Sequence, residues 1–174
     1  MVCLNISSSF IRIRDLEEKD LEYIYKWYNM TEEFRFATGY NEPVRFEELK
    51  NMYTKAILQE NVFFAGIHNE NDIMIGMING RIIAGNKSRI WLNIFAIDPA
   101  HRRKGYGSIA FNMLVEHFAS DKNISEIFLA VERQNNQGKQ FWEKQDFEEI
   151  KKVKHTRMLM GLCDDITIMR RKLA

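Results

Sequence analysis

The sequence contains few residues that restrict or cross-link a chain, with two prolines and two cysteines among its 174 residues. Cys3 and Cys163 do not have the spacing of a zinc site or a redox motif. A chain of this length does not need a disulfide to be stable. The sequence therefore predicts reduced thiols in a cytoplasmic protein.

Long apolar runs are also missing. No stretch approaches the roughly 18 consecutive apolar residues of a membrane-spanning helix, and residues 1–10 lack a basic flank followed by an apolar run. Neither a membrane partner nor secretion is expected. No linker-like segment and no internal repeat interrupts the chain, so we expect a single domain over residues 1–174.

The net charge is only +1, which argues against general nucleic-acid binding because such binding needs a basic face. The charge is unevenly distributed, however. Residues 1–60 hold 8 Lys or Arg and 11 Asp or Glu, a net charge of −3, and the remainder carries +4. Most such charge is ordinary solvated surface, but the asymmetry also fits a cationic substrate that meets an anionic cofactor.

The periodicity of apolar residues predicts the order of helices and strands. Short apolar runs separated by turn residues, between positions 62 and 97, predict an antiparallel meander. The expected elements are a strand at 10–14; a helix that opens with Asp15, Glu17 and Glu18 and places Leu21, Ile24, Tyr25 and Tyr28 on one face; a loop at 31–43; a helix at 46–58; strands at 62–68, 73–84 and 90–97; a helix at 105–120; a strand at 126–131; a helix at 136–144; and strands near 148–159 and 166–172.

These elements define a fold class. The strand at 90–97 is apolar on both alternating faces except at Asn93, which predicts a central strand covered on both sides. A meander followed by a strand–helix–strand crossover predicts a mixed, mostly antiparallel sheet. We therefore expect an α+β domain with three layers, the sheet lying between helices on both faces.

The junction between the central strand and the helix at 105–120 has the features of an anion-binding turn. Arg102, Arg103 and Lys104 supply positive charge, and Gly105 and Gly107 let consecutive backbone N–H groups face outward without a Cβ. A helix N-terminus adds about half a positive charge. The turn therefore predicts a phosphate-binding site.

Three other interpretations of this turn are open to comparison. Gly105-x-Gly107-x-x-Ala110 formally matches the dinucleotide fingerprint, but seven residues separate its glycines from the strand, whereas the fingerprint follows its strand directly. The Gly-x-x-x-x-Gly-Lys-Ser/Thr phosphate loop is absent from the sequence, which excludes ATP binding by that route. A basic surface turn without a ligand would explain the short motif alone.

The wider stretch from Ile94 to Gly107 resembles the main motif of the GNAT superfamily of acyl-CoA N-acyltransferases. It has a hydrophobic strand, Pro99 two residues after it, and then Arg/Gln-x-x-Gly-x-Gly beginning at Arg102. A second block, from Asn135 to Phe147, resembles the family's later motif, in which an Asn opens a helix and a bulky pair precedes a terminal Phe. With the element order, the resemblance covers about residues 10–172.

The resemblance implies an acetyl-CoA-dependent N-acetyltransferase. It implies that the central strand and the strand at 126–131 splay apart, so that backbone groups ending at Ile97 bind the pantetheine arm and N–H groups of residues 103–108 bind the pyrophosphate. The cofactor-binding residues expected on this basis are Phe95, Ala96, Ile97, Arg102, Arg103, Lys104, Gly105, Tyr106, Gly107, Ser108, Asn135 and Trp142. Asn135 could equally be a plain N-cap.

The residues for proton transfer depart from the family pattern. Many relatives carry a Glu base on the central strand, where this chain has Trp91 and Leu92, and a Tyr acid where it has Trp142. An indole N–H donates a hydrogen bond but releases no proton at neutral pH. As substitutes we expect Glu132 as a base and Asn93, a buried amide, as a water holder. Tyr25, Tyr28 and Tyr40 are further candidates, although core packing would also explain them.

The acceptor predicted by this comparison is a primary amine of a small molecule or a peptide N-terminus. Substrate choice in the family usually falls to the first two helices and the segment between them, here residues 27–40, where aromatic and acidic residues alternate. The four histidines, at positions 68, 101, 117 and 155, have no ligand spacing, so no metal is expected. A homodimer is left open, and a non-catalytic acyl-CoA-binding module is the alternative function.

Overall fold

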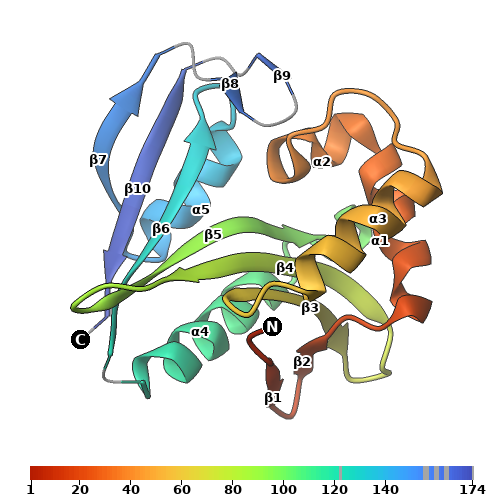
Figure 1. Cartoon of the computed structure of the whole chain (residues 1–174), viewed down its shortest axis with the longest axis horizontal. Helices are drawn as coiled ribbons and strands as arrows, with labels where there is room; N and C mark the ends of the chain where they lie inside the picture. Colours follow the sequence, from red (N-terminus) through yellow and green to blue (C-terminus); the bar gives the residue numbers. More distant parts are fainter. Residues whose placement is uncertain (122, 155–156, 159–160, 163–164, 174) are drawn as a thin grey trace.

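The computed structural model describes residues 1–121, 123–154, 157–158, 161–162 and 165–173, and its main feature is a sheet of eight strands in the order β1-β2-β3-β4-β5-β6-β10-β7 (Figure 1). Neighbouring strands are antiparallel except β5 and β6, which run parallel. The strands are β1 Asn5–Ser7, β2 Ile11–Asp15, β3 Val62–Asn69, β4 Met74–Ile83, β5 Ser88–Ile97, β6 Ile124–Glu132, β7 Glu148–Val153 and β10 Ile166–Lys172; β8 Arg157–Met158 and β9 Gly161–Leu162 form a separate pair.

Five α-helices accompany the sheet within the described residues. They are α1 Leu21–Asn29, α2 Thr31–Thr38, α3 Phe46–Ile57, α4 Tyr106–Ala119 and α5 Asn136–Lys144, with short 3-10 turns at Glu18–Asp20 and Pro99–His101. None of the helices in this part of the chain is long and apolar enough to cross a membrane.

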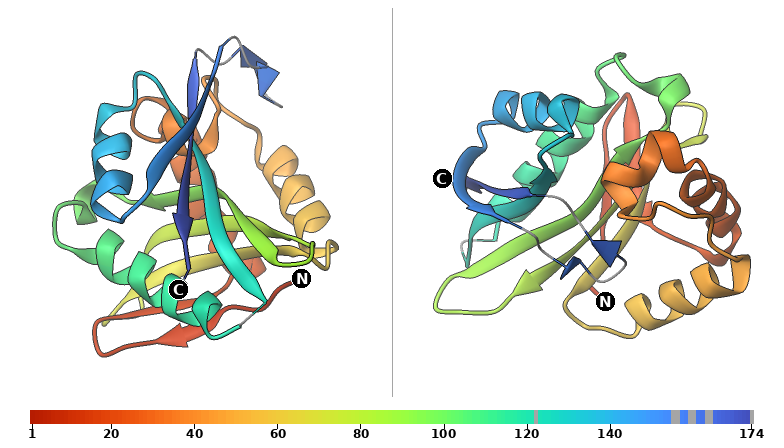
Figure 2. Two further views of the ribbon diagram at one scale, coloured as in Figure 1. Left: turned by 90° about the vertical axis from the view of Figure 1, so that its left-hand side faces the viewer. Right: turned by 90° about the horizontal axis from the view of Figure 1, so that it is seen from above.

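The alternation of side chains along β3 shows how the sheet is covered on both faces. Phe63, Ala65 and Ile67 pack into a core with α4 and Trp142 of α5, whereas Phe64 packs with α1, α2 and α3. Figures 1 and 2 show α4 on one side of the meander and the first three helices on the other. The expected three-layer α+β fold, with a mixed and mostly antiparallel sheet, is confirmed.

A β-bulge at Asn93 determines which face each β5 residue serves. Asn79 of β4 pairs with Ile94 and the next residue of β4 pairs with Leu92, which leaves Asn93 as the extra residue. Ile90 and Leu92 therefore face the α4 core, whereas Ile94 lies in the core beneath the first helices. The prediction that Asn93 is a buried amide is wrong, because the bulge leaves its side chain exposed.

Most of the expected elements are confirmed, including the meander, α3, α4 and α5, with boundaries within two residues. The loop expected at 31–43 is wrong in its first part, where α2 forms because Phe34 is fully buried against Trp27. β1 was not expected, since three residues are too few to show alternation. The strand expected near 148–159 ends at Val153, and residues 157–158 form β8 of the separate pair; residues 155, 156 and 159 lie outside the described residues.

The start of the first helix also differs from expectation. Asp15 ends β2, and α1 begins only at Leu21, because the buried Asp20 carboxylate accepts a 2.8 Å hydrogen bond from the Glu17 N–H and pairs with Arg14 at 2.7 Å. Tyr25 is exposed, whereas Trp27 takes the expected core position beside Leu21, Ile24 and Tyr28.

Candidate active site

The turn between β5 and α4 has the backbone geometry of an anion site. The Asp98 side chain caps the 3-10 turn by accepting a 2.9 Å hydrogen bond from the Ala100 N–H. Arg103 and Gly105 then adopt left-handed conformations, with φ of 60° and 85°, and Gly105 is the N-cap of α4. Left-handed residues next to right-handed ones turn successive N–H groups toward one concave surface.

The N–H groups of this turn are available for a ligand. Within the described part of the chain, no group accepts a hydrogen bond from the backbone N–H of residues 103–108, whereas the next N–H, of Ile109, bonds to the Gly105 carbonyl. Six consecutive donors at a helix N-terminus favour a multiply charged anion. The turn therefore suits a phosphate or pyrophosphate group.

The parallel strands β5 and β6 separate on the side of this turn. Their pairing runs from Ser88 opposite Ile124 to Trp91 opposite Phe128, and no later pair is formed in the described residues. Beyond that point Leu92–Ile97 of β5 and Leu129–Val131 of β6 have backbone groups that do not bond to each other. The splay that the GNAT resemblance implies is therefore present, and the bulge at Asn93 lies within it.

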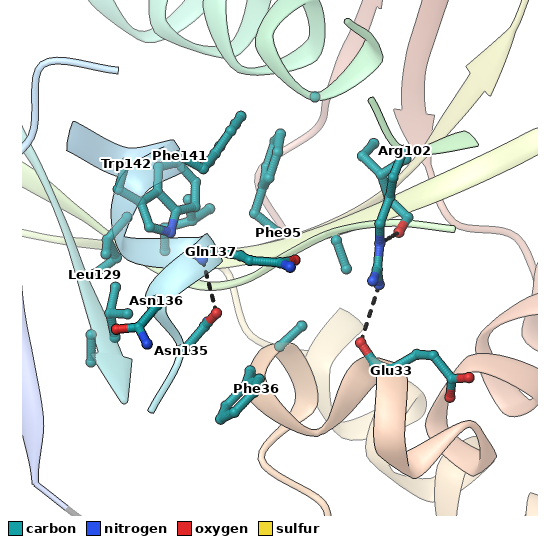
Figure 3. Close-up of a pocket in the computed structure, with 18 of the residues that line it drawn as sticks. Glu33, Phe36, Phe95, Arg102, Leu129, Asn135, Asn136, Gln137, Phe141 and Trp142 are labelled. Carbon is teal, nitrogen blue, oxygen red and sulfur yellow. Dashed lines mark hydrogen bonds between the residues drawn. The ribbon is translucent and has the colours of Figure 1, made fainter. Parts of the chain in front are cut away.

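A pocket of about 720 Å³ occupies the space between the splayed strands, α2 and α5 (Figure 3). A volume of this size suits a small-molecule or cofactor site. The lining residues are Glu32, Glu33, Phe36 and Ala37 of α2; Leu92, Asn93, Phe95, Ala96 and Ile97 of β5; Arg102 and Gly107 of the turn; Leu129, Ala130 and Val131 of β6; and Gln134, Asn135, Asn136, Gln137, Gly138, Phe141 and Trp142 in and before α5.

One wall of the pocket is aromatic and closely packed. Phe95 stacks on Phe141 with 5.9 Å between ring centroids, and Trp142 meets Phe95 edge-to-face at 5.4 Å. Trp142 also contacts Phe111 and Phe147, and only 8% of its surface is exposed. Such interlocked rings form a rigid apolar wall.

The start of α5 supplies the polar edge of the same wall. The side-chain oxygen of Asn135 accepts a 2.9 Å hydrogen bond from the Gly138 N–H, so Asn135 is the N-cap of the helix. Asn135 also lines the pocket, so both roles weighed for it from the sequence are compatible. Figure 3 shows the Gln137 amide extending from α5 into the pocket, toward Arg102.

Arg102 lines the pocket, but its side chain is already engaged by protein groups. Its Nε donates to the Ile97 carbonyl at 2.8 Å, and its Nη2 donates to the Glu33 carbonyl at 3.1 Å. Its guanidinium lies 5.3 Å from the ring centroid of Phe34, and burial lowers the pKa of Arg102. The cationic groups left at the rim of the turn are Arg103 and Lys104, both exposed.

Seven of the expected cofactor-binding residues line the pocket, namely Phe95, Ala96, Ile97, Arg102, Gly107, Asn135 and Trp142. The other expected turn residues, Arg103, Lys104, Gly105, Tyr106 and Ser108, carry the available N–H groups beside it. Sequence reasoning missed Gln137 and did not single out Phe36 and Ala37, although both lie within residues 27–40, the segment expected to select the substrate. Gln137 lies inside the second GNAT-like block and could have been found there, whereas the two α2 residues belong to the segment expected to be a loop.

The two residues expected to transfer protons are placed differently from each other. Asn93 lines the pocket, and its Nδ2 donates to the Asn79 side-chain oxygen at 3.1 Å. Glu132 ends β6 and is not among the lining residues. The acidic residues that do line the pocket are Glu32 and Glu33 of α2, although Figure 3 shows the Glu33 side chain pointing away from the cavity.

The tyrosines of the first helices do not line the pocket. Burial raises the pKa of Tyr28 and of Tyr40, and the two rings pack edge-to-face at 5.2 Å. The Tyr40 hydroxyl lies 3.2 Å from the Met52 sulfur. These contacts favour the core-packing interpretation of Tyr28 and Tyr40 over a role in proton transfer.

No group of three or more His, Cys, Asp or Glu side chains that could hold a metal ion occurs within the described residues. His155 and Cys163 lie outside them. Of the other three histidines, His68 is buried, His117 is exposed, and His101 lies in the 3-10 turn beside Asp98.

The model of the acetyltransferase (GNAT) family matches residues 21–147 of this chain. The chain belongs to the GNAT family of acetyltransferases. The match includes the α2 helix, the splayed strands, the anion-binding turn and α5, which together line the pocket. GNAT proteins are acyltransferases, so the pocket of this GNAT chain is the candidate acyl-transfer site.

Individual relatives agree with this family assignment. A stretch of 79 residues is 32% identical to the probable N-acetyltransferase san of Drosophila melanogaster; it covers 45% of this chain and 43% of the fly protein, so less than half of that relative is matched. Two crystal structures share the fold of this GNAT chain. A spermidine N-acetyltransferase from Vibrio cholerae in complex with CoA and spermine has a TM-score of 0.80 at 20% identity, covering 95% of this chain and 97% of that one. An acetyltransferase from Salmonella typhimurium that modifies the N-terminal serine of ribosomal protein L7/L12 has a TM-score of 0.81 at 17% identity, covering 96% and 97%.

Proposed function

We propose that this chain transfers an acetyl group from acetyl-CoA to a primary amine of a small molecule or of a peptide N-terminus. The observation that carries the proposal is the pocket itself, which extends from the anion-binding turn, between the splayed strands, to the acidic helix α2. One side suits an anionic cofactor and the other a cationic acceptor. The two similar crystal structures are of enzymes that acetylate spermidine and a protein N-terminus, which are both amines.

The chain's own groups account for donor binding. N–H groups of residues 103–108 bind the pyrophosphate, and the free backbone edge of β5 up to Ile97 binds the pantetheine arm. Asn135 and the Phe95–Trp142 wall position the arm from the α5 side. When bound, acetyl-CoA supplies a thioester carbonyl, and a backbone N–H near Phe95 or Ala96 stabilises the charge that develops on its oxygen.

The acceptor must lose a proton before it can attack, since an alkylammonium has a pKa of about 10 and no lone pair. Glu32 attracts the ammonium to the pocket, and Asn93 holds water that carries the proton to solvent. For Glu132 to act as the base, its side chain has to turn into the pocket, which its neighbour Val131 lines. Trp142 provides no acid, so sulfur departs as a thiolate, which costs about 2 kcal/mol at pH 7 for a thiol of pKa near 8.5.

The direct test is release of free thiol from acetyl-CoA in the presence of single amines. The panel contains polyamines, aminoglycosides and peptides with free N-termini, with the matching quaternary or N-acetylated compounds as controls. Turnover with a primary amine, absent for its blocked counterpart, is the expected result.

A non-catalytic acyl-CoA-binding module is the second candidate function. It is favoured by Leu92 and Trp142, which place apolar groups where relatives carry a base and an acid. The panel separates the two functions. Stoichiometric binding of acetyl-CoA with no thiol release for any amine would support the binding module and refute the transferase.

A further inference from the structure

Arg102 connects two parts of the pocket that lie far apart in sequence. Its backbone leads into the anion-binding turn, whereas its guanidinium donates to the carbonyl of Glu33 in α2 and to the carbonyl of Ile97 at the end of β5. Figure 3 shows this bridge across one side of the cavity. The planar guanidinium is suited to two carbonyls at once, and a lysine ammonium would not reproduce that geometry.

α2 packs against α1 and β5, and this bridge adds a hydrogen bond from a side chain outside the helix to the α2 backbone. α2 is a helix of eight residues, too short to be stable by itself, and Phe34 is its one fully buried side chain. No side chain caps its N-terminus. Phe34 lies between the Arg102 guanidinium, 5.3 Å from its ring centroid, and the Trp27 ring, with which it stacks at 5.7 Å.

A second connection joins the same turn to the first helices. The Trp27 indole N–H donates to the Asp98 carboxylate at 2.7 Å, and Asp98 in turn caps the 3-10 turn that leads to Arg102. The segment from Asp98 to Arg102 thus holds both α1 and α2. A displacement of the turn by a bound phosphate would therefore be transmitted to α2, and a displacement of α2 to the turn.

We propose that Arg102 is a positioning residue that couples the CoA-binding turn to the amine-binding helix α2. This inference rests on the proposed function, because it assigns the turn to CoA and α2 to the amine. Thermodynamic reciprocity then requires that CoA binding strengthens amine binding by the same factor as amine binding strengthens CoA binding. Arg102 acts through α2 and does not touch the reacting atoms.

The test is hydrogen–deuterium exchange of residues 31–38 in the wild type and in Arg102→Lys, each with and without CoA. Loss of the hydrogen bond from the charged Arg102 side chain to the Glu33 carbonyl should speed exchange in α2 by roughly tenfold without CoA. CoA should slow exchange of α2 in the wild type and leave it unchanged in Arg102→Lys. With an amine that the panel identifies, the variant should raise KM about tenfold while kcat changes by less than about threefold.

Arg103→Lys is the matched control, because Arg103 lies in the same turn and its exposed side chain has no hydrogen bond or ion pair with described residues. Without CoA, its α2 exchange should equal that of the wild type. The proposal is overturned if α2 exchanges equally in Arg102→Lys and the wild type, or if the change in α4 is as large as that in α2. Failure of the wild type to bind CoA would refute the proposed function. The comparison of the wild type with Arg102→Lys in the absence of CoA tests separately whether Arg102 holds α2 in place.

Discussion

The side-chain oxygen of Asn135 lies 2.9 Å from the backbone nitrogen of Gly138, and this hydrogen bond explains why position 138 is a glycine. A Cβ at position 138 would lie 2.3 Å from Asn135 Nδ2 and 2.7 Å from Asn135 Oδ1. No side chain can be added there unless the cap moves. The pair therefore fixes the start of α5 at the edge of the pocket.

Gly138→Ala should lower the free energy of unfolding by about 1 kcal/mol, because the cap is lost. In an ordinary helix the same change would raise it by up to about 1 kcal/mol. Urea unfolding of Gly138→Ala, of Asn135→Ala and of the double variant Asn135→Ala/Gly138→Ala measures how the effect of Gly138→Ala depends on Asn135. In the Asn135→Ala background, Gly138→Ala should be neutral or stabilising, and an equal loss in both backgrounds would contradict the role of Asn135.

Trp27→Phe should destabilise the protein by about 1.5–3 kcal/mol, because it removes a hydrogen bond to the charged Asp98 while keeping the stack on Phe34. Trp91→Phe is the control, since the Trp91 indole has no hydrogen bond to described residues and its side chain is half-buried. Although burial opposes ionisation, the bonds from Trp27 and Ala100 keep the pKa of Asp98 below its ordinary 3.8.

That lowered pKa gives the Trp27 effect a pH dependence. A group with a depressed pKa stabilises the fold above its unfolded value and loses that contribution as the pH falls through the folded value. The difference between wild type and Trp27→Phe should therefore be constant above about pH 4 and shrink below it. If the difference in unfolding free energy between the two proteins stays constant between pH 5 and pH 3, ionisation of Asp98 does not contribute to it.

His68 should make stability fall in mild acid. It is 1% exposed, and neither ring nitrogen has a partner among the described residues. Burial, reinforced by the charge of Arg14, lowers the pKa of His68 from its ordinary 6.5. The unfolded chain therefore takes up a proton first, and stability declines as the pH falls from 6.5 toward the folded pKa.

The corresponding experiment compares urea unfolding at pH 7.5 and pH 5 for the wild type, His68→Leu and His117→Gln. The dependence on pH should be smaller in His68→Leu, because no buried imidazole remains to be charged. His117 is exposed, so His117→Gln should keep the wild-type dependence. An unchanged dependence in His68→Leu would mean that other groups cause the loss.

Glu32 and Glu33 form a matched pair for testing the acceptor side. Both line the pocket, but Figure 3 shows the Glu33 carboxylate pointing away from it. Glu32→Gln should raise KM for a cationic amine by about tenfold, with little change in kcat. A tenfold change corresponds to roughly 1.4 kcal/mol of charge attraction that the variant loses. Glu33→Gln should change KM by much less. Equal effects of the two variants would place amine recognition elsewhere.

The sequence alone predicted the elements whose periodic pattern of apolar residues extends over many consecutive positions. The meander, α4 and α5 all have strong periodicity, and the glycine turn at residues 103–108 has chemistry of its own. Other features depend on tertiary contacts that no local pattern encodes. α2 exists because Phe34 finds Trp27, and Asn93 is exposed because a bulge shifts β5 by one residue against β4.

The direction of a long side chain was likewise beyond local reasoning. A basic residue next to a phosphate turn suggests contact with phosphate, yet the Arg102 guanidinium bonds to the carbonyls of Ile97 and Glu33. Glu132 looked suitable at the end of β6, but the pocket is lined by its neighbour Val131. Which face a strand end presents depends on pairing with β10, which the sequence does not reveal.

The central claim is that the six N–H groups of residues 103–108 bind the pyrophosphate of the acyl donor. Calorimetric titration with acetyl-CoA and with acetyl-pantetheine, which lacks the nucleotide and its phosphates, tests it most directly. Acetyl-CoA should bind at least about a hundredfold more tightly, because several charge-assisted hydrogen bonds are made only with the phosphates. Equal affinities, or no binding of acetyl-CoA, would contradict the account.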